Sequence, residues 1–149
     1  MANEGGSALL LDTHTAIWLV DGTLRSNLVE MIAEASGRKG VFVSPISAWE
    51  VGLLAEKSGL AEKSGTKGAV EFRDGPIAWF DRLVAGPIRL APFTPAMAIG
   101  ASLLPTWAHR DPADRLLVAT ARVLDATLIT RDRAILAYAK TGAVQAIAC

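Results

Sequence analysis

Five short, largely apolar runs recur along this chain of 149 residues, and they constrain its fold more than any other feature. The runs cover 8–11, 41–43, 88–91, 126–130 and 144–148. Short continuous apolar runs are typical of strands that are buried on both faces of a parallel sheet. Segments with helical character lie between them, and parallel strands need such crossovers. The sequence therefore predicts an α/β fold with a parallel twisted sheet of four to five strands and helices on both faces.

The chain is expected to form one domain over 8–149, preceded by a flexible leader over 1–7 that contains a Gly-Gly-Ser sequence. Hydrophobic residues make up 51% of the chain and charged residues 20%, which favours a packed core over disorder. Fifteen Lys and Arg residues balance fifteen Asp and Glu residues. This neutral balance argues against a nucleic-acid binder held by phosphate contacts alone, but it allows a local basic rim around an acidic site.

Cys149 is the only cysteine, so no disulfide can form within the chain. That usage suits a reducing cytoplasm. The N-terminal segment lacks the basic cluster and long apolar run of a signal peptide, and no run approaches the roughly 18 to 20 apolar residues of a membrane span. We expect a cytoplasmic protein that does not associate with a membrane.

The segment from Arg110 to Arg115 is a well-signalled helix start. Asp111 is a suitable N-cap, Pro112 fits the first helical position, and Asp114 falls in the first turn, where free backbone N–H groups favour a carboxylate. The apolar residues that follow predict that the helix over 112–124 is buried on one side.

Three further acids occupy comparable junctions. Asp12 ends the first apolar run, and Asp132 lies just beyond the fourth. Glu50 belongs to the helix predicted after the second run, where it shares an apolar stripe. The stripe consists of Ile46, Trp49, Leu53 and Leu54. Because ligands of parallel sheets bind beyond the carboxyl ends of the strands, Asp12, Glu50, Asp114 and Asp132 are all expected at one edge.

Capping alone explains Asp12, Asp111 or Asp132 when each is taken singly. Glu50 resists that explanation, because an acid on an apolar stripe is costly without a partner. Four clustered carboxylates need a cation to offset their repulsion, and Mg²⁺ or Mn²⁺ is the natural candidate. His14 and His109 are the only histidines, so a His/Cys zinc site is not indicated, and His109 is interpreted as a polar turn residue.

Four motifs in this order resemble the PIN domain, and most closely the VapC-type toxins of bacterial toxin–antitoxin pairs. The motifs are Asp12-Thr13, Ser47-Ala48-Trp49-Glu50, Asp111-Pro112-x-Asp114-Arg115 with its Leu-Leu-x-Ala-x-Ala continuation, and Leu128-Ile129-Thr130-Arg131-Asp132. The likeness covers about Leu9 to Ala139. It departs from the usual pattern at Ala113, where relatives often carry a bulky aromatic residue.

The resemblance implies a Mg²⁺- or Mn²⁺-dependent endoribonuclease in which metal-activated water cleaves RNA phosphodiester bonds. It also implies that Asp12 and Asp114 are the principal metal ligands, with Glu50 and Asp132 completing the catalytic set. Thr13, Asp111 and Thr130 would be auxiliary. A VapB-type antitoxin and a homodimer are the implied partners.

Arg110, Arg115 and Arg131 are interleaved with the acids, so they are candidates for RNA contact, although local pairing with the neighbouring carboxylates explains them equally well.

Two alternatives differ in class from the nuclease. A receiver-like signalling module also clusters Asp around Mg²⁺, but it needs an acid after the third strand, where this chain has Ala91-Pro92. A non-catalytic PIN domain that only binds RNA or protein is the second alternative, and the complete acidic set disfavours it.

Overall fold

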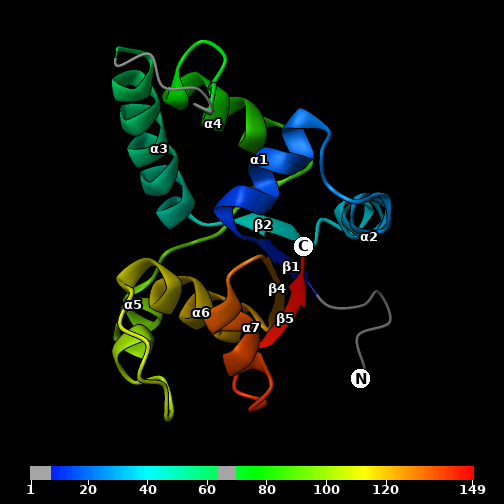
Figure 1. Ribbon diagram of the computed structural model, residues 1–149. Helices are drawn as coiled ribbons and strands as arrows, with labels where there is room; N and C mark the ends of the chain where they lie inside the picture. The colour runs from blue at the N-terminus through cyan, green and yellow to red at the C-terminus, as the bar shows by residue number, and fades with distance from the viewer. Residues whose placement is uncertain (1–7, 64–69) are drawn as a thin grey trace.

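The computed structural model describes residues 8–63 and 70–149 (Figure 1). Within these residues, five strands form one sheet in the order β3-β2-β1-β4-β5, and every neighbouring pair is parallel. The strands are β1 (Ala8–Leu11), β2 (Val41–Val43), β3 (Arg89–Leu90), β4 (Ala126–Thr130) and β5 (Gln145–Ala148). The predicted parallel α/β sheet is confirmed, with five strands. The leader predicted over 1–7 lies outside the described residues.

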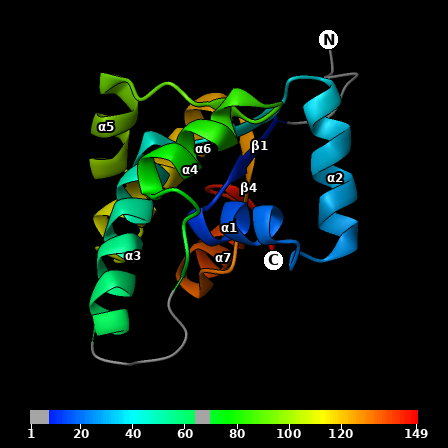
Figure 2. The same ribbon diagram turned by 90° about the horizontal axis from the view of Figure 1, so that it is seen from above.

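Helices connect the strands and cover both faces of the sheet (Figures 1 and 2). Their bounds are α1 (Thr13–Asp21), α2 (Ser26–Gly37), α3 (Pro45–Lys63), α4 (Pro76–Ala85), α5 (Pro95–Ser102), α6 (Pro112–Leu124) and α7 (Arg133–Ala139). In Figure 1, α1 and α4 lie above the sheet, and α5, α6 and α7 lie below it.

The alternation of side chains along β1 creates two hydrophobic cores, one on each face of the sheet. Leu9 and Leu11 pack into a core shared with helices α1, α2 and α4, and Leu10 packs into a second core with α6 and α7. Leu10 and Leu11 are completely buried. Burial on both faces explains why the strands read as continuous apolar runs in the sequence.

The order of the strands defines where a ligand site is expected. From β1 the chain proceeds to β2 and β3 on one side, and it then returns to place β4 on the other side of β1. The carboxyl ends of β1 and β4 therefore flank the point where the connection reverses direction, which is where open α/β sheets bind ligands. Asp12 follows β1 directly, and Asp132 lies two residues beyond β4.

Two features of the region after β2 differ from what the sequence predicts. The polar, glycine-containing composition of 56–75 predicts a mobile, solvated connection with fraying helix as an open alternative, whereas α3 is continuous to Lys63; residues 64–69 lie outside the described part. The apolar stripe was also misplaced, because Trp49 and Leu53 are 58% and 38% exposed whereas Ser47 and Val51 are buried. Ser47 faces α1, where its hydroxyl lies 3.0 Å from Thr13 Oγ1, and hydropathy does not mark that face as buried.

Within residues 8–63 and 70–149, no helix has both the length and the apolar character needed to cross a bilayer.

Candidate active site

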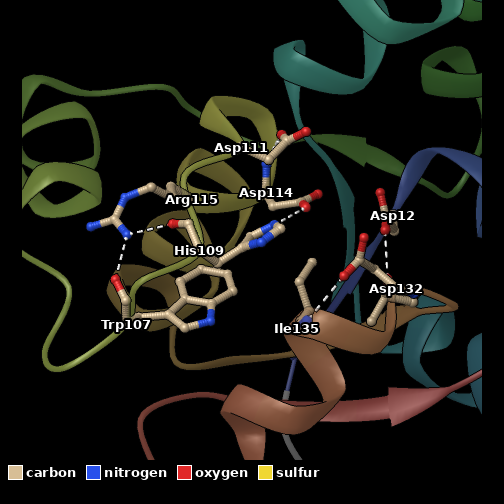
Figure 3. Close-up of polar contacts among 9 residues, drawn as sticks. Asp12, Trp107, His109, Asp111, Asp114, Arg115, Asp132 and Ile135 are labelled. Atoms are coloured by element: carbon tan, nitrogen blue, oxygen red, sulfur yellow. Dashed lines mark hydrogen bonds and ion pairs between the residues drawn. The ribbon is translucent and has the colours of Figure 1, made fainter.

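The strand side of the site consists of Asp12 and Asp132, which are joined through Thr130. Thr130 is the last residue of β4, and its buried hydroxyl donates to Asp12 Oδ2 at 2.6 Å. The hydroxyl oxygen of Thr130 also accepts the backbone N–H of Asp132 at 3.0 Å. Because β1 and β4 are hydrogen-bonded neighbours, one side chain can position both acids. Figure 3 shows the carboxylates of Asp12 and Asp132 side by side.

Both strand-side acids also start helices. Asp12 Oδ1 accepts the backbone N–H of Thr13 at 2.7 Å at the start of α1, and Asp132 Oδ1 accepts the N–H of Ile135 at 3.0 Å at the start of α7. The capping roles predicted from the sequence are therefore confirmed. Each cap uses one carboxylate oxygen, so the other oxygen of the same residue takes no part in capping the helix.

The helix side of the site consists of Glu50 and Asp114, which reach the pocket from α3 and α6. Thr13 Oγ1 donates to Glu50 Oε1 at 2.7 Å and also lies 3.0 Å from Ser47 Oγ. Asp114 Oδ2 lies 2.7 Å from His109 Nε2 (Figure 3). Asp111 Oδ1 accepts the N–H of Asp114 at 3.1 Å, so Asp111 caps α6 at the exposed rim as predicted.

Burial and mutual repulsion make these carboxyls harder to ionise. Burial, reinforced by the charges of Asp12 and Asp114, raises the pKa of Glu50 to about 7 although Thr13 opposes the shift. Burial, together with Asp132, also raises the pKa of Asp114 to about 6 against the hydrogen bond from His109. The pKa of Asp12 is raised by burial as well, with partial compensation from Thr130. The pKa of each of these three acids responds to the charge of at least one other acid of the set, so the acids lie near one another.

The chemistry of the donor set fits a divalent cation. Among the residues that the structure describes, His109, Asp114 and Asp132 each offer a ligand atom, and these atoms lie within 4.8 Å of one another. Carboxylate oxygens are the ligands that Mg²⁺ and Mn²⁺ prefer. A bound cation would favour the ionised form of these carboxyls, whose pKa values are raised chiefly by burial and further by mutual repulsion.

Arg115, for which the sequence left RNA contact and pairing with neighbouring carboxylates as alternatives, instead binds backbone carbonyls in α5 and in the loop before α6. The guanidinium of Arg115 donates to the carbonyls of Ala101, Trp107 and His109 at 2.8, 3.1 and 2.9 Å. In Figure 3 the group points away from the acids and toward these carbonyls. Arg115 stabilises the approach to α6 because three carbonyls from two segments meet at its planar donor array.

Arg131 has a different environment and stays a candidate for RNA contact. Its side chain is exposed beside Asp132, with its guanidinium 5.3 Å from the ring centroid of Trp18 and Nη2 3.1 Å from His14 Nε2. Burial, followed by the charge of Arg131, lowers the pKa of His14, so the pair holds one positive charge beside the acids. Arg110 is exposed in the segment before α6 and also stays a candidate.

Sequence reasoning missed His109, which was interpreted as a turn residue. The structure directs its imidazole into the pocket, against Asp114 (Figure 3). The signal available in the sequence was its position five residues before Asp114, in a segment that also contains the aromatic Trp107. Without the course of the loop, that spacing does not show which way the ring points.

Comparisons with known proteins place the whole domain beside characterised relatives. The sequence matches the model of the PIN domain family over residues 9–141. Ribonuclease VapC22 of Mycobacterium tuberculosis is 30% identical over 127 residues, which are 85% of this chain and 88% of that protein.

Two solved structures share the fold at low sequence identity. VapBC from Salmonella typhimurium, crystallised bound to DNA, has a chain that matches with a TM-score of 0.66 and 15% identity over 96% of this chain and 98% of that one. VapBC2 from Rickettsia felis, bound to a DNA fragment from its promoter, matches with a TM-score of 0.65 and 14% identity over 95% and 98% of the two chains. At such identities the likeness concerns the fold.

Proposed function

The chain belongs to the PIN domain family, and from that premise we propose that it is a Mg²⁺- or Mn²⁺-dependent endoribonuclease acting as the toxin of a toxin–antitoxin pair. The observation that carries the proposal is the convergence of Asp12, Glu50, Asp114 and Asp132 at the point where the strand order reverses. The relative in Mycobacterium tuberculosis is named a ribonuclease, which supports RNA as the substrate class.

The four acids and the two threonines have different proposed roles in the pocket. Asp12 and Asp114 would be the principal ligands of the metal ion. Glu50 and Asp132 are further candidate ligands, and they would also complete the negative pocket and orient the attacking water. When bound, Mg²⁺ or Mn²⁺ neutralises charge on the scissile phosphate and lowers the pKa of water. Thr130 and Thr13 keep Asp12 and Glu50 in place through short hydrogen bonds, so the pocket is organised before substrate arrives.

Arg131 and Arg110 would contact the RNA backbone near the acids. A neutral protein with an acidic pocket needs local positive charge to attract a polyanion. The stacking of Arg131 over Trp18 holds its guanidinium at the entrance without a carboxylate partner within the described residues.

A VapB-type antitoxin is the proposed protein partner. The matched solved structures are VapBC assemblies. A cavity of about 750 Å³ lies between α1 and α4, with Ile17, Trp18, Trp79 and Leu83 in its wall. His14 lines the same cavity, so a peptide seated there would reach the entrance of the acidic pocket. Binding at this place would both cover apolar surface and obstruct RNA.

We also propose that the protein forms a homodimer and acts in the cytoplasm. Large apolar side chains are exposed on α3 and at the end of α5, namely Trp49, Leu53, Ile99 and Leu103. These helices lie on the same side of the molecule in both views (Figures 1 and 2). Exposed apolar side chains on helices of one side of the molecule suit a surface that another protein covers.

The proposal is tested by RNA cleavage with purified protein. We expect RNA cleavage with Mg²⁺ or Mn²⁺ and none with EDTA. In Asp12→Asn and Asp114→Asn the cleavage rate should fall by more than about 100-fold, because removing a metal ligand costs more activity than removing a residue that only orients a ligand. Asn keeps the oxygen with which Asp12 caps α1, and at Asp114 it has nearly the same size and shape, so both variants should fold. Asp125→Asn is the matched control, since Asp125 ends α6 far from the pocket in a left-handed conformation that Asn tolerates. Full activity in both pocket variants would refute the assignment.

The family assignment excludes the receiver-like module. A non-catalytic PIN domain is the remaining alternative, and it predicts RNA binding without cleavage under every metal condition of the same assay.

A further inference from the structure

His109 brings a ring nitrogen into a pocket otherwise made of carboxylates. Its Nε2 belongs to the group of ligand atoms, with Asp114 and Asp132, that lie within 4.8 Å of one another. Ligands about 2.1 Å from a shared ion lie up to about 4.2 Å apart, so only small side-chain movements separate this arrangement from a coordination shell.

The contact between His109 and Asp114 indicates where a cation would bind. Nε2 and Oδ2 are 2.7 Å apart, and at that distance a proton must lie between them because two lone pairs would repel each other. Divalent cations displace protons from their ligands when they bind. The same two atoms that share a proton in the metal-free protein are therefore able to share a metal ion.

The surroundings of His109 hold the ring in this orientation. The His109 carbonyl accepts from Arg115 at 2.9 Å, and the imidazole lies 4.9 Å from the ring of Trp107. Trp107 in turn stacks on Tyr138 of α7, with ring centroids 4.3 Å apart and planes 7° from parallel. The Tyr138 hydroxyl donates to the carbonyl of Pro105 at 2.5 Å. These contacts with α6 and α7 fix His109 more firmly than is usual for a polar residue in a turn.

We propose that His109 Nε2 is a direct ligand of the divalent ion, together with Asp114 and Asp132, and that it biases the site toward Mn²⁺ over Mg²⁺. This inference rests on the metal-dependent function proposed above and adds a nitrogen donor to its acidic ligand set. Mg²⁺ favours an all-oxygen shell, whereas imidazole is a good ligand for first-row transition metals. The competing role is that of a positioning residue, which would only orient Asp114 while the ion contacts oxygen alone.

Pulsed electron paramagnetic resonance of bound Mn²⁺ separates these two roles. The full chain, with any affinity tag removed, is loaded with one equivalent of Mn²⁺, and the echo modulation is recorded for nitrogen coupling. We expect ¹⁴N coupling in the unmutated protein and a change to ¹⁵N frequencies when its histidines are ¹⁵N-labelled. The labelled protein needs no substitution, so the test does not depend on how a variant folds.

Substitutions then identify which histidine is responsible. His109→Gln keeps a donor toward Asp114 but has no ring nitrogen, so the coupling should disappear. His14→Gln is the matched control, because His14 also lies near the acids but contacts Arg131, and its coupling should persist. By titration calorimetry, His109→Gln should weaken Mn²⁺ binding by about tenfold or more and Mg²⁺ binding by less than about threefold.

The possible failures are distinguishable. If Mn²⁺ binds and no histidine coupling appears, or if coupling persists in His109→Gln, the nitrogen ligand is refuted while the metal-dependent function stands. Equal loss of Mn²⁺ and Mg²⁺ affinity in His109→Gln, without nitrogen coupling, assigns His109 to positioning Asp114. If Mn²⁺ does not bind the unmutated protein, both proposals fail together.

Discussion

The two sides of the acidic pocket are built in different ways. On the strand side, Asp12 and Asp132 follow neighbouring strands and share the hydroxyl of Thr130. On the helix side, Glu50 and Asp114 reach in from α3 and α6, each with one side-chain hydrogen bond. Burial is the main cause that raises the pKa of Glu50 to about 7 and the pKa of Asp114 to about 6.

The difference lies in what positions the acids on each side and in how much their burial opposes ionisation. The strand side takes its geometry from the hydrogen-bonded sheet, which changes little when ligands bind. The helix side depends on how two helices and the loop over 103–111 pack, and it carries much of the electrostatic cost. In the proposed function, the strand side would therefore define where the site is, and the helix side would make occupation by a cation favourable.

Removing the shared hydroxyl should break the strand side and produce the largest effect of the three variants that follow. Thr130→Val deletes the donor to Asp12 and the acceptor for the Asp132 N–H at a completely buried position. We expect RNA cleavage to fall by about 10- to 100-fold, the usual cost of losing a partner that orients a metal ligand. Thr130→Ser should recover most of the activity. Equal activity in Thr130→Val and the unmutated protein would show that the sheet alone positions Asp12.

Loosening the helix side should affect stability. Arg115→Met keeps much of the apolar stem but removes the donors to the carbonyls of Ala101, Trp107 and His109. We expect the free energy of unfolding in urea to fall by about 1.5 to 3 kcal/mol, as for hydrogen bonds from a charged group.

Arg110→Met is the control, because Arg110 is exposed and its replacement should change stability by less than about 0.5 kcal/mol. If Arg115→Met weakens RNA binding and leaves the free energy of unfolding unchanged, Arg115 contacts RNA and does not stabilise the loop.

The smallest effect concerns the dependence of stability on pH. The folded-state pKa values of Glu50 and Asp114 lie above their ordinary values of 4.5 and 3.8. Between about pH 4 and pH 7 the metal-free folded state therefore binds more protons than the unfolded state, so the free energy of unfolding should decrease as the pH rises through this window.

Glu50→Gln should flatten this decrease in thermal scans without metal. At pH 8 we expect a gain of about 1 kcal/mol, since the partial exposure of Glu50 screens its repulsion, which corresponds to about 2 to 4 °C in Tm. Added Mn²⁺ should stabilise the unmutated protein more than the variant. A metal-free Tm that rises with pH over the same window would contradict the proposed repulsion.

Much of the fold and of the acidic set was predictable because the signals are local. Strands buried on both faces appear as apolar runs, and Asp12, Asp111 and Asp132 appear as caps since an N-cap acts on backbone groups within three residues. The extension of α3 to Lys63 was missed because Gly59 and the polar composition of that stretch weigh against a helix. The exposure of Trp49 was missed because hydropathy does not reveal which face of α3 meets the sheet.

The sequence by itself determined that strands and helices alternate and that acids stand where strands end, because these features follow from hydropathy and from capping over a few residues. The tertiary structure alone decided that β4 lies beside β1, that Arg115 binds loop carbonyls and that His109 points toward Asp114. Each of these depends on the packing of segments that do not adjoin in the chain, and such packing has no signature in a short stretch of sequence.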